Sequence, residues 1–492
     1  MKIDVIDNLD AFTKLKASWD AVYEADPESQ IFLSWNWMWA WFRKIDSKWS
    51  VMAAKPDAKS AYVAFLPLQH RIEMKKDGTF YNELKMGGSE FADYTGFICD
   101  PSHQDEAAAA FADRLLEMSW MRLNFVNILA SDKRFRLFMK AFERPKLAVE
   151  NVRRFNKKTK IDSNIYPFVK LPGDWETYCA EKLSTNTRQK AKRFLKRLDE
   201  SGEFRVTHAT KATIDRDIDI LLKFWETKWA AQKGKTLRGI LSNNRMMLKH
   251  SLEVGAAFLP VLWAGDRPLA AHGTLMDTSK RSMHFLIGGR DETYNSPPPG
   301  FMLHAYSLRW SIQNGFKIFD FLQGNEDYKY MFGAEERLVK CVTISTKTKL
   351  NLGDKLDAYC LPEVLERTTA LHKEGKLGEA AIGYRQIIEA DPHHTGALYL
   401  FAQLEAVRAN HAAAEKLFTA YLAEKPKAAD GWLRLGKVQQ AQGNALGAIA
   451  SLRKVLELEP ANREAASLVT QLSPLDDLLS AAAGPRPKWL PG

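Results

Sequence analysis

The sequence predicts a mixed α/β region followed by an all-α region of helical repeats. Between Met283 and Lys329, a short apolar strand, a Pro/Gly-rich turn, a helix and a second apolar strand follow one another, which is the order of a βαβ unit. Towards the C-terminal end, prolines and alanines recur with a period of 34 residues, as is typical of repeat architectures. The composition, with 46% hydrophobic and 26% charged residues over a length of 492, is that of a globular protein of several domains.

Residues 1–160 are expected to form a first α/β domain. Its predicted elements are a helix near 10–25, a Trp-rich segment at 31–42 and a strand at 61–72. The Trp-rich segment invites a role in sugar stacking or membrane contact. Because Ser34 is a good N-cap residue and apolar residues follow it, we interpret the segment as a helix buried against a sheet. The basic linker RRFNKKTK at 153–160 separates this part from the next.

Residues 161–350 are expected to form a second α/β domain that contains the βαβ unit. Before that unit, the pattern predicts helices within 174–200, at 214–231 and at 243–254, and strands at 258–264, 268–277 and 282–288. The helix of the unit follows Gly300, and Asn314-Gly315 stops it as a C-terminal cap should. The returning strand spans 317–322.

The start of the helix after Gly300 is expected to bind an anion. Backbone N–H groups at a helix N-terminus lack intrahelical acceptors, and the helix dipole favours negative charge there. Here these groups belong to Gly300, Phe301 and Met302, and Ser296 and Pro299 lie in the turn that leads into the helix. We therefore predict that these five residues bind the phosphate-bearing part of a cofactor.

The segment 361–472 is predicted to contain three helical repeats and a capping helix. Pro392, Pro426 and Pro460 are spaced 34 residues apart, and Ala380, Ala414 and Ala448 keep the same period. This is the tetratricopeptide (TPR) pattern, in which a small alanine lets the two helices of a repeat approach each other. Such repeats build an all-α solenoid whose groove suits a protein partner. Residues 473–492 are expected to be a disordered tail.

Charge and cysteine content limit the partners and the surroundings. The formal net charge of +10 makes anionic partners plausible, among them CoA, nucleotide sugars, tRNA and an acidic membrane surface. The four cysteines lie far apart without a Cys-x-x-Cys pair, which predicts reduced thiols and no zinc site. We expect a cytoplasmic protein, because neither a signal peptide nor an apolar run of about 18–20 residues is evident. Peripheral membrane association stays open, and motifs for a P-loop, a dinucleotide site, a zinc protease or a serine hydrolase are absent.

Three segments carry a resemblance to a known superfamily: AGDRPLAAHGTLM at 264–276, GGRDETYNSPPPG at 288–300 and FDFLQGNEDYK at 319–329. They resemble the core of the GNAT (GCN5-related N-acetyltransferase) superfamily, and most of all the CelD-like branch of cellulose and exopolysaccharide biosynthesis, which is related to the Fem-type aminoacyltransferases. The chain departs from the family pattern in the SPPPG turn, in the inserted Asp327 and in the lack of the ordinary phosphate loop. The resemblance implies two tandem GNAT-like halves, of which the first is degenerate.

The resemblance also implies where acyl transfer would take place. In such folds two neighbouring strands, here 282–288 and 317–322, splay apart and hold the pantetheine arm between them. Asp320 is then the amine-binding group or the base, although a structural Asp that caps a turn is the alternative. Glu326, Tyr328 and Lys329 follow at the mouth of the cleft. Tyr328 would protonate a leaving thiolate, and Glu326 and Lys329 would bind substrate, with a plain surface loop as the alternative for Glu326.

Further candidates lie on the strands and helices nearby. His272 is a second candidate base, and a satisfied core histidine is the competing interpretation; His284 and His304 rank below it. Asp291 and Tyr294 are counted as substrate-binding residues that also shape the loop before the helix. Arg188, Lys192 and Lys196 lie on one side of a basic helix, which is either a solvated face or a patch for an anionic substrate.

We therefore expect an N-acyltransferase that moves an acetyl or other acyl group from acyl-CoA to an amine of an amino sugar or polysaccharide precursor. The TPR repeats are expected to dock a protein partner, and neither nucleic acid nor a metal is expected to bind. Two alternatives remain open: a Fem-like aminoacyltransferase that uses aminoacyl-tRNA, and an inactive GNAT-fold scaffold or sensor.

Overall fold

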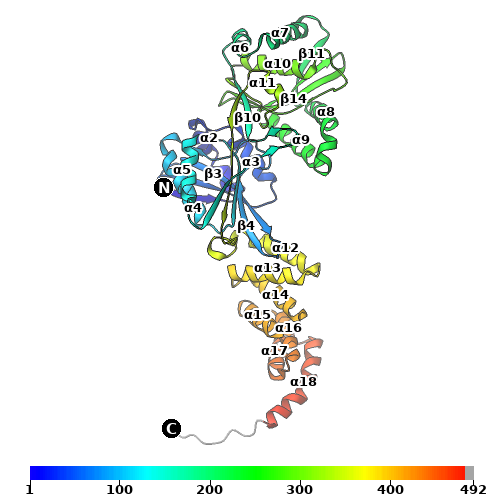
Figure 1. Ribbon diagram of the computed structural model, residues 1–492. Coiled ribbons are helices and arrows are strands. Elements are labelled where there is room, and N and C mark those ends of the chain that lie inside the picture. Colours follow the sequence, from blue (N-terminus) through cyan, green and yellow to red (C-terminus); the bar gives the residue numbers. More distant parts are fainter. Residues whose placement is uncertain (483–492) are drawn as a thin grey trace. The chain divides into compact units, whose positions relative to one another are not determined.

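The computed structural model describes the backbone of residues 1–482 and the side chains of residues 1–472. The chain divides into two compact units (Figure 1). The first unit comprises residues 1–70, 84–117 and 123–347, and the second comprises residues 71–83 and 118–122 together with the chain from Thr348 onwards. The predicted borders at 160 and 350 therefore do not coincide with the division into compact units, because two short segments of the first half pack with the C-terminal helices.

The first half of the chain forms one eight-stranded sheet in the order β1-β2-β3-β4-β6-β18-β7, with β5 beside β3. Its strands are β1 (Lys2–Ile6), β2 (Trp49–Lys55), β3 (Ala64–Met74), β4 (Phe80–Met86), β5 (Ile98–Cys99), β6 (Arg122–Ile128), β7 (Leu147–Asn151) and β18 (Lys340–Thr346). Its helices are α1 (Leu9–Lys14), α2 (Lys16–Ala25), α3 (Trp35–Lys44), α4 (Gln104–Leu116) and α5 (Asp132–Met139). The position of β18 is a correction, because this strand was assigned to the second domain and instead pairs with β7 of the first sheet.

The second sheet has the order β11-β13-β14-β15-β16-β10-β17, with β12 beside β14. Its strands are β10 (Ile165–Lys170), β11 (Phe204–His208), β12 (Ala257–Phe258), β13 (Pro260–Ala264), β14 (Arg267–Asp277), β15 (Ser282–Arg290), β16 (Ile318–Asp320) and β17 (Glu335–Leu338). The associated helices are α6 (Trp175–Glu181), α7 (Thr185–Glu200), α8 (Ile214–Lys233), α9 (Leu237–Glu253), α10 (Pro299–Gln313) and α11 (Asp327–Tyr330). The basic segment at 153–160 is part of a small hairpin of β8 (Phe155–Asn156) and β9 (Ile161–Asp162).

Alternation along the central strands explains why helices cover both faces of the second sheet. Val261 and Ala271 pack with α8 in one core cluster, whereas their neighbours Leu262 and Ala270 pack with α10 in another. Successive side chains of a strand point to opposite faces, so α8 and α10 lie on opposite sides (Figure 1). The sequence prediction of the βαβ unit is confirmed, because β15 and β16 pair in parallel and α10 connects them.

The Trp-rich segment lies in the core of the first unit, as expected. The Ser34 hydroxyl accepts a hydrogen bond from the backbone N–H of Trp37 and caps α3. Trp37 and Trp41 are buried in a cluster that also contains Tyr166 and Leu275 of the second half. One hydrophobic cluster therefore spans both halves of the first unit, while the second half also has core clusters of its own.

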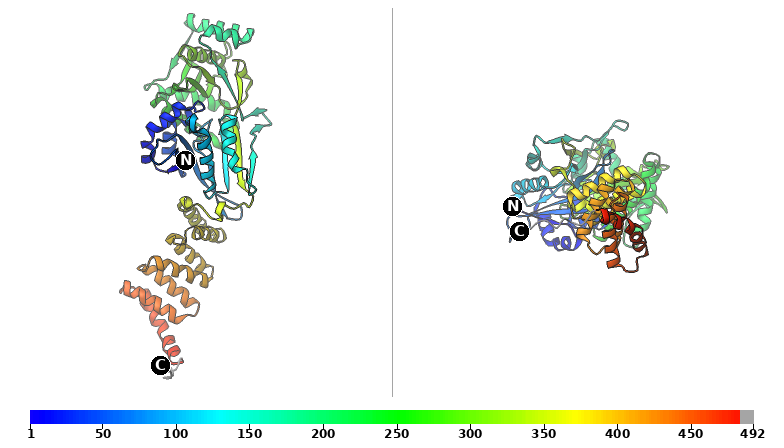
Figure 2. Two further views of the ribbon diagram at one scale, coloured as in Figure 1. Left: turned by 90° about the vertical axis from the view of Figure 1, so that its left-hand side faces the viewer. Right: turned by 90° about the horizontal axis from the view of Figure 1, so that it is seen from below.

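The second unit continues as consecutive paired helices (Figure 2). They are α12 (Leu361–Lys373), α13 (Leu377–Ala390), α14 (Thr395–Val407), α15 (His411–Glu424), α16 (Ala429–Ala441), α17 (Ala445–Leu458) and α18 (Arg463–Ala482). The periodic Ala380, Ala414 and Ala448 are all fully buried between paired helices, as the 34-residue pattern predicts. Helix α18 continues to Ala482, so the predicted disordered tail is wrong for residues 473–482; its remainder, 483–492, lies outside the described residues.

The first helix pair of the second unit tolerates no extra atom at Gly383. A methyl group on Gly383 would collide with Oγ1 of Thr368 and lie 3.0 Å from Cε2 of Phe80. We expect Gly383→Ala to lower the free energy of unfolding by about 1–3 kcal/mol, the usual cost of overpacking. Gly378→Ala in the same helix has open space around it, and should be neutral or stabilising by up to ~1 kcal/mol. Urea unfolding of both variants checks this, and equal effects would contradict the packing described.

Candidate functional site

The candidate site lies where β15 and β16 part. The two strands pair at Ser282/Ile318, Met283/Phe319 and His284/Asp320. Beyond that point β16 ends, whereas β15 continues to Arg290 with its edge towards β16 unpaired. The expected divergence of these strands is therefore present, and it begins at Asp320.

Aromatic side chains fill the space between the diverging strands. The rings of Phe285 and His304 lie 4.8 Å apart, and those of His304 and Phe332 lie 5.4 Å apart. His272 packs 4.2 Å from His304. Burial lowers the pKa of His272 well below its ordinary value and that of His304 to about 3, so both rings are neutral.

The proposed role of His272 as a base does not fit its surroundings. Its side chain is 2% exposed, and its Nδ1 faces Oγ of Ser307 at 3.4 Å. It is the satisfied core histidine that the sequence left as the alternative. His284 is buried too, with Nε2 at 2.9 Å from Oγ of Ser282, and burial lowers its pKa.

The start of α10 offers two backbone donors rather than three. Met302 donates its N–H to the carbonyl of Pro298 at 3.1 Å, which corrects its assignment to the anion site, and its side chain is buried in the core. Pro298 and Pro299 have no N–H, so Gly300 and Phe301 hold the remaining amides of the first turn. The side chain of Arg290 lies over Gly300, since a methyl group there would be 3.4 Å from Cδ of Arg290. Two amides thus remain at the helix start beside the Arg290 side chain, whose guanidinium donates to Glu292 at 2.8 Å, and Ser296 is exposed in the preceding turn.

Asp320 is a buried junction between the two halves of the first unit. Its Oδ2 accepts a hydrogen bond from the hydroxyl of Tyr94 at 2.7 Å and lies 3.4 Å from Nη1 of Arg337. Its Oδ1 accepts from the N–H of Leu322 at 2.8 Å, and Leu322 has a φ of +55°. The side chain therefore caps a turn in the left-handed region, which is the structural alternative considered for it.

Asp93, on the loop before β5, lies at the same turn and was missed by the sequence interpretation. Burial and the neighbouring charge of Asp320 raise its pKa to about 7, against the opposing charges of Lys329 and Arg154. The backbone N–H of Gln323 also opposes this rise of the pKa. A carboxyl group that titrates near neutral pH is suited to take up and release a proton.

Lys329 organises the turn that faces Asp93. Its side chain is 2% exposed, and its Nζ donates to the carbonyls of Gln323 at 2.7 Å and Gly324 at 2.8 Å. The Glu326 carboxylate lies 2.9 Å from the same Nζ. Burial lowers the pKa of Lys329 in spite of Glu326. Both residues are thus engaged in fixing the loop after β16.

The remaining predicted residues lie in two places. Tyr328 is half-buried with its ring 5.4 Å from that of His304, and burial raises its pKa, so it keeps its proton at neutral pH. Asp291 accepts hydrogen bonds from Nε of Arg267 and from the N–H of Thr293, both at 2.9 Å. Although burial works against it, these bonds hold the pKa of Asp291 below its ordinary value. Tyr294 lies beneath the Arg267 guanidinium, so Asp291 and Tyr294 shape the loop.

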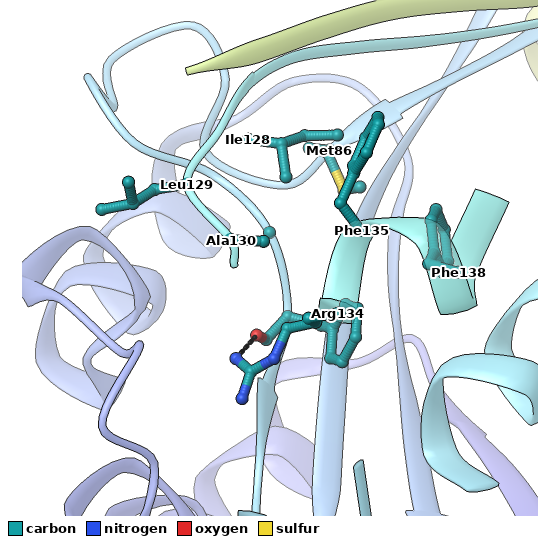
Figure 3. Close-up of a pocket in the computed structure, with 9 residues that line it drawn as sticks. Met86, Ile128, Leu129, Ala130, Arg134, Phe135 and Phe138 are labelled. Carbon is teal, nitrogen blue, oxygen red and sulfur yellow. Dashed lines mark hydrogen bonds between the residues drawn. The ribbon is translucent and has the colours of Figure 1, made fainter. Parts of the chain in front are cut away.

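A cavity beside Arg134 in the first half is too small for a substrate (Figure 3). Its volume is about 10 Å³, room for no more than a water molecule. Arg134 itself forms a buried ion pair with Asp26, with both guanidinium nitrogens at 2.9 Å from the carboxylate. This arrangement is structural.

Comparison with known proteins identifies one part of the chain. Residues 185–330 match the family model of an acetyltransferase (GNAT) domain, and this stretch includes β15, α10 and β16. This stretch of the chain is therefore similar to a GNAT-type domain. A search of curated proteins finds no match.

Solved structures give partial similarities. FemX has 10% identity and a TM-score of 0.49, over 70% of this chain and 97% of its own. A conserved protein of unknown function from Bacteroides thetaiotaomicron has 10% identity and a TM-score of 0.44, over 70% and 100%. The first TPR of Spaghetti (RPAP3), bound to an HSP90 peptide, has 25% identity and a TM-score of 0.23, over 25% of this chain and 96% of its own.

The raised pKa of Asp93 makes stability depend on pH. Its pKa is about 7 in the folded chain and ~3.9 when unfolded, so the folded state binds the proton more tightly and loses stability as pH rises from about 4 to about 7. We expect the gain in Tm of Asp93→Asn over the parent to grow from pH 4 to 7 and then level off. Thermal scans across this range check the result.

Asp291→Asn is the control of opposite sign. Because the pKa of Asp291 lies below its ordinary value, its contribution is present at neutral pH and is lost on acidification. This variant should therefore be less stable than the parent at pH 7. If the Asp93→Asn curve runs parallel to that of the parent, the assignment of Asp93 is wrong.

Proposed function

We propose that the protein is an N-acyltransferase that moves an acyl group, in the simplest case acetyl, from acyl-CoA to an amine. The observation that supports this most strongly is the carboxyl group of Asp93, with a pKa of about 7, at the turn where β15 and β16 diverge. In addition, a GNAT-type domain covers both strands. The acceptor we propose is an amine on an amino sugar or a polysaccharide precursor, on the basis of the sequence resemblance.

Acyl transfer from a thioester to an amine requires the protein to hold the two substrates in position and to provide one proton acceptor. An acceptor amine is protonated at neutral pH, and only its neutral form attacks the acyl carbon. Asp93 takes the proton from the ammonium group, the nitrogen forms the new amide bond, and the carbon–sulfur bond breaks. Tyr328, which keeps its proton in the resting state, donates that proton to the leaving sulfur, and the second proton that the nitrogen loses as the amide forms restores the Tyr328 hydroxyl. Asp320 takes no proton in this scheme; it fixes Tyr94 and the turn that faces Asp93.

The start of α10 suits the diphosphate end of the acyl-CoA donor. The amides of Gly300 and Phe301 suit a diphosphate, and the Arg290 side chain beside them would join them by exchanging Glu292 for a phosphate. The free edge of β15 beyond His284 offers backbone groups to a pantetheine arm. The aromatic rings of Phe285 and Phe332 lie in the path between these groups. Donor binding therefore requires these rings to move aside.

We also propose that the paired helices of the second unit bind a protein partner. The buried alanines at a period of 34 residues support helix pairs of the TPR type, which serve assembly rather than chemistry. An aminoacyl-tRNA donor is the second candidate for the reaction. The exposed basic side chains of Lys192 and Lys196 on α7 favour it.

Calorimetric titration with acetyl-CoA tests the donor. We expect binding by the parent and at least tenfold weaker binding by Gly300→Glu, because a carboxylate at the helix start repels the diphosphate. Gly173→Glu adds the same charge at an open position and should bind as the parent does. Absence of heat with acetyl-CoA, together with salt-sensitive binding of aminoacyl-tRNA, would move the assignment to the second candidate.

The pH profile of acyl transfer tests the base. With glucosamine as acceptor and CoA release as the signal, kcat/KM should rise with pH and level off above about 7, as Asp93 loses its proton. Asp93→Asn should lower kcat/KM roughly 10²–10⁴-fold, the usual contribution of a general base. Asp266→Asn, at a fully exposed position, should have no effect. Turnover that survives in Asp93→Asn with an unchanged profile would rule out this role.

A further inference from the structure

The hairpin formed by α8 and α9 projects beyond the sheet that its base covers. Ile218 and Leu221, in the first half of α8, are fully buried against the sheet. From Lys223 through the connecting turn to Met247, by contrast, no residue is buried. Figure 1 shows α8 and α9 side by side at the margin of the second half. We call residues 223–241 the hairpin tip.

The hairpin tip carries an apolar stripe, of which Trp225 and Leu241 pack in part against the core cluster at the base of the hairpin. Its members are the partly buried side chains of Trp225, Trp229, Leu237, Ile240 and Leu241. The two tryptophans are one helical turn apart, with ring centroids separated by 6.3 Å. Leucine and isoleucine follow at helical spacing on α9, so both helices present apolar groups at the tip.

The same tip is strongly basic. Between residues 223 and 238 there are five basic side chains, Lys223, Lys228, Lys233, Lys235 and Arg238, and one acidic side chain, Glu226, which leaves a net charge of +4. Glu226 lies 3.6 Å from Lys223, and the nearby Glu292 pairs with Arg290 at 2.8 Å. Glu226 is already counted in this net charge, and Glu292, whose pKa Lys228 helps to lower, is bonded to Arg290, so a positive charge remains at the end of the hairpin.

Basic and aromatic groups at the tip are interleaved. The Nζ atoms of Lys228 and Lys233 lie 5.2 Å and 5.9 Å from the ring centre of Trp229. Tryptophan with flanking lysines is the combination that occupies the boundary between lipid headgroups and acyl chains, because the ring is amphipathic and the lysine stem bends towards the phosphates.

We propose that the hairpin tip docks the protein on an anionic lipid surface. Each lysine or arginine near such a surface increases the affinity about fivefold. The apolar stripe increases it further by inserting below the lipid headgroups. No helix among the described residues is long and apolar enough to span a membrane, so attachment at the interface is the mode that this hairpin suits. The proposal does not depend on the reaction proposed above.

Charge alone would also suit RNA, but the apolar stripe favours lipid. Leu237, Ile240 and Leu241 offer no stacking surface for bases, and the face of Trp229 is approached by its own lysines. Proteins that bind single-stranded nucleic acid place aromatic rings along a basic groove instead. An anionic membrane uses both the charge and the aliphatic side chains.

Vesicle co-sedimentation of the full chain tests the proposal. We expect binding to vesicles of phosphatidylglycerol mixed into phosphatidylcholine, no binding to phosphatidylcholine alone, and release by salt. Lys233→Glu with Lys235→Glu, which removes the net charge of the tip, should weaken binding more than tenfold. Trp229→Ala should weaken binding to these vesicles severalfold. The binding that remains should be electrostatic and should therefore be abolished by salt.

The basic helix α7 supplies the matched control. Lys192 and Lys196 are 47% and 72% exposed, and changing both to Glu alters the net charge of the chain by the same amount. This variant should bind vesicles as the parent does. Equal losses in the two charge-reversed variants, binding to neutral vesicles, or tip-dependent binding to tRNA in place of vesicles would each overturn the proposal. Far-UV circular dichroism confirms that all variants are folded.

Discussion

The buried carboxylate of Asp320 holds the candidate site together. One of its oxygens accepts a hydrogen bond from the hydroxyl of Tyr94 in the first half, and the other accepts from the N–H of Leu322 and fixes the left-handed turn there in the second half. A charge with no exposed surface is costly unless it is paired and hydrogen-bonded, so the groups around Asp320 are constrained to their positions. The loop that carries Asp93 and the turn that carries Lys329 are therefore held in a fixed position relative to each other.

This constraint separates the roles of the two carboxylates. Asp320 has its oxygens engaged, whereas Asp93 lies beside it with a pKa raised to about 7 by burial and by the charge of Asp320. Two carboxyl groups in different surroundings thus have different roles, because Asp320 holds the turn in place and Asp93 is suited to accept a proton. Since Asp93 belongs to the first half, the GNAT-type domain alone, at 185–330, does not contain the whole of the candidate site.

The sequence pattern correctly predicted those features that depend on interactions between residues close together in the chain. The βαβ unit, the cap at Ser34 and the buried alanines of the C-terminal helices follow from periodicity and capping, and the structure contains them. The return of β18 to the first sheet and the meeting of Asp93 with Asp320 are long-range pairings that no spacing reveals. Met302 was wrongly assigned to the anion site because α10 begins at Pro299. The amide of Met302 therefore already donates to the carbonyl of the N-cap residue, Pro298.

The most direct test of this account is the titration of Asp93 itself. Carbon-13 NMR of the aspartate carboxyl groups, with Asp93→Asn to assign the signal, reports its protonation without any substrate. The account predicts a midpoint near pH 7, which moves down when Asp320→Asn removes the neighbouring charge. A midpoint near 4, the ordinary value for an exposed aspartate, would show that Asp93 is a surface carboxylate and would remove the base on which the proposed reaction depends.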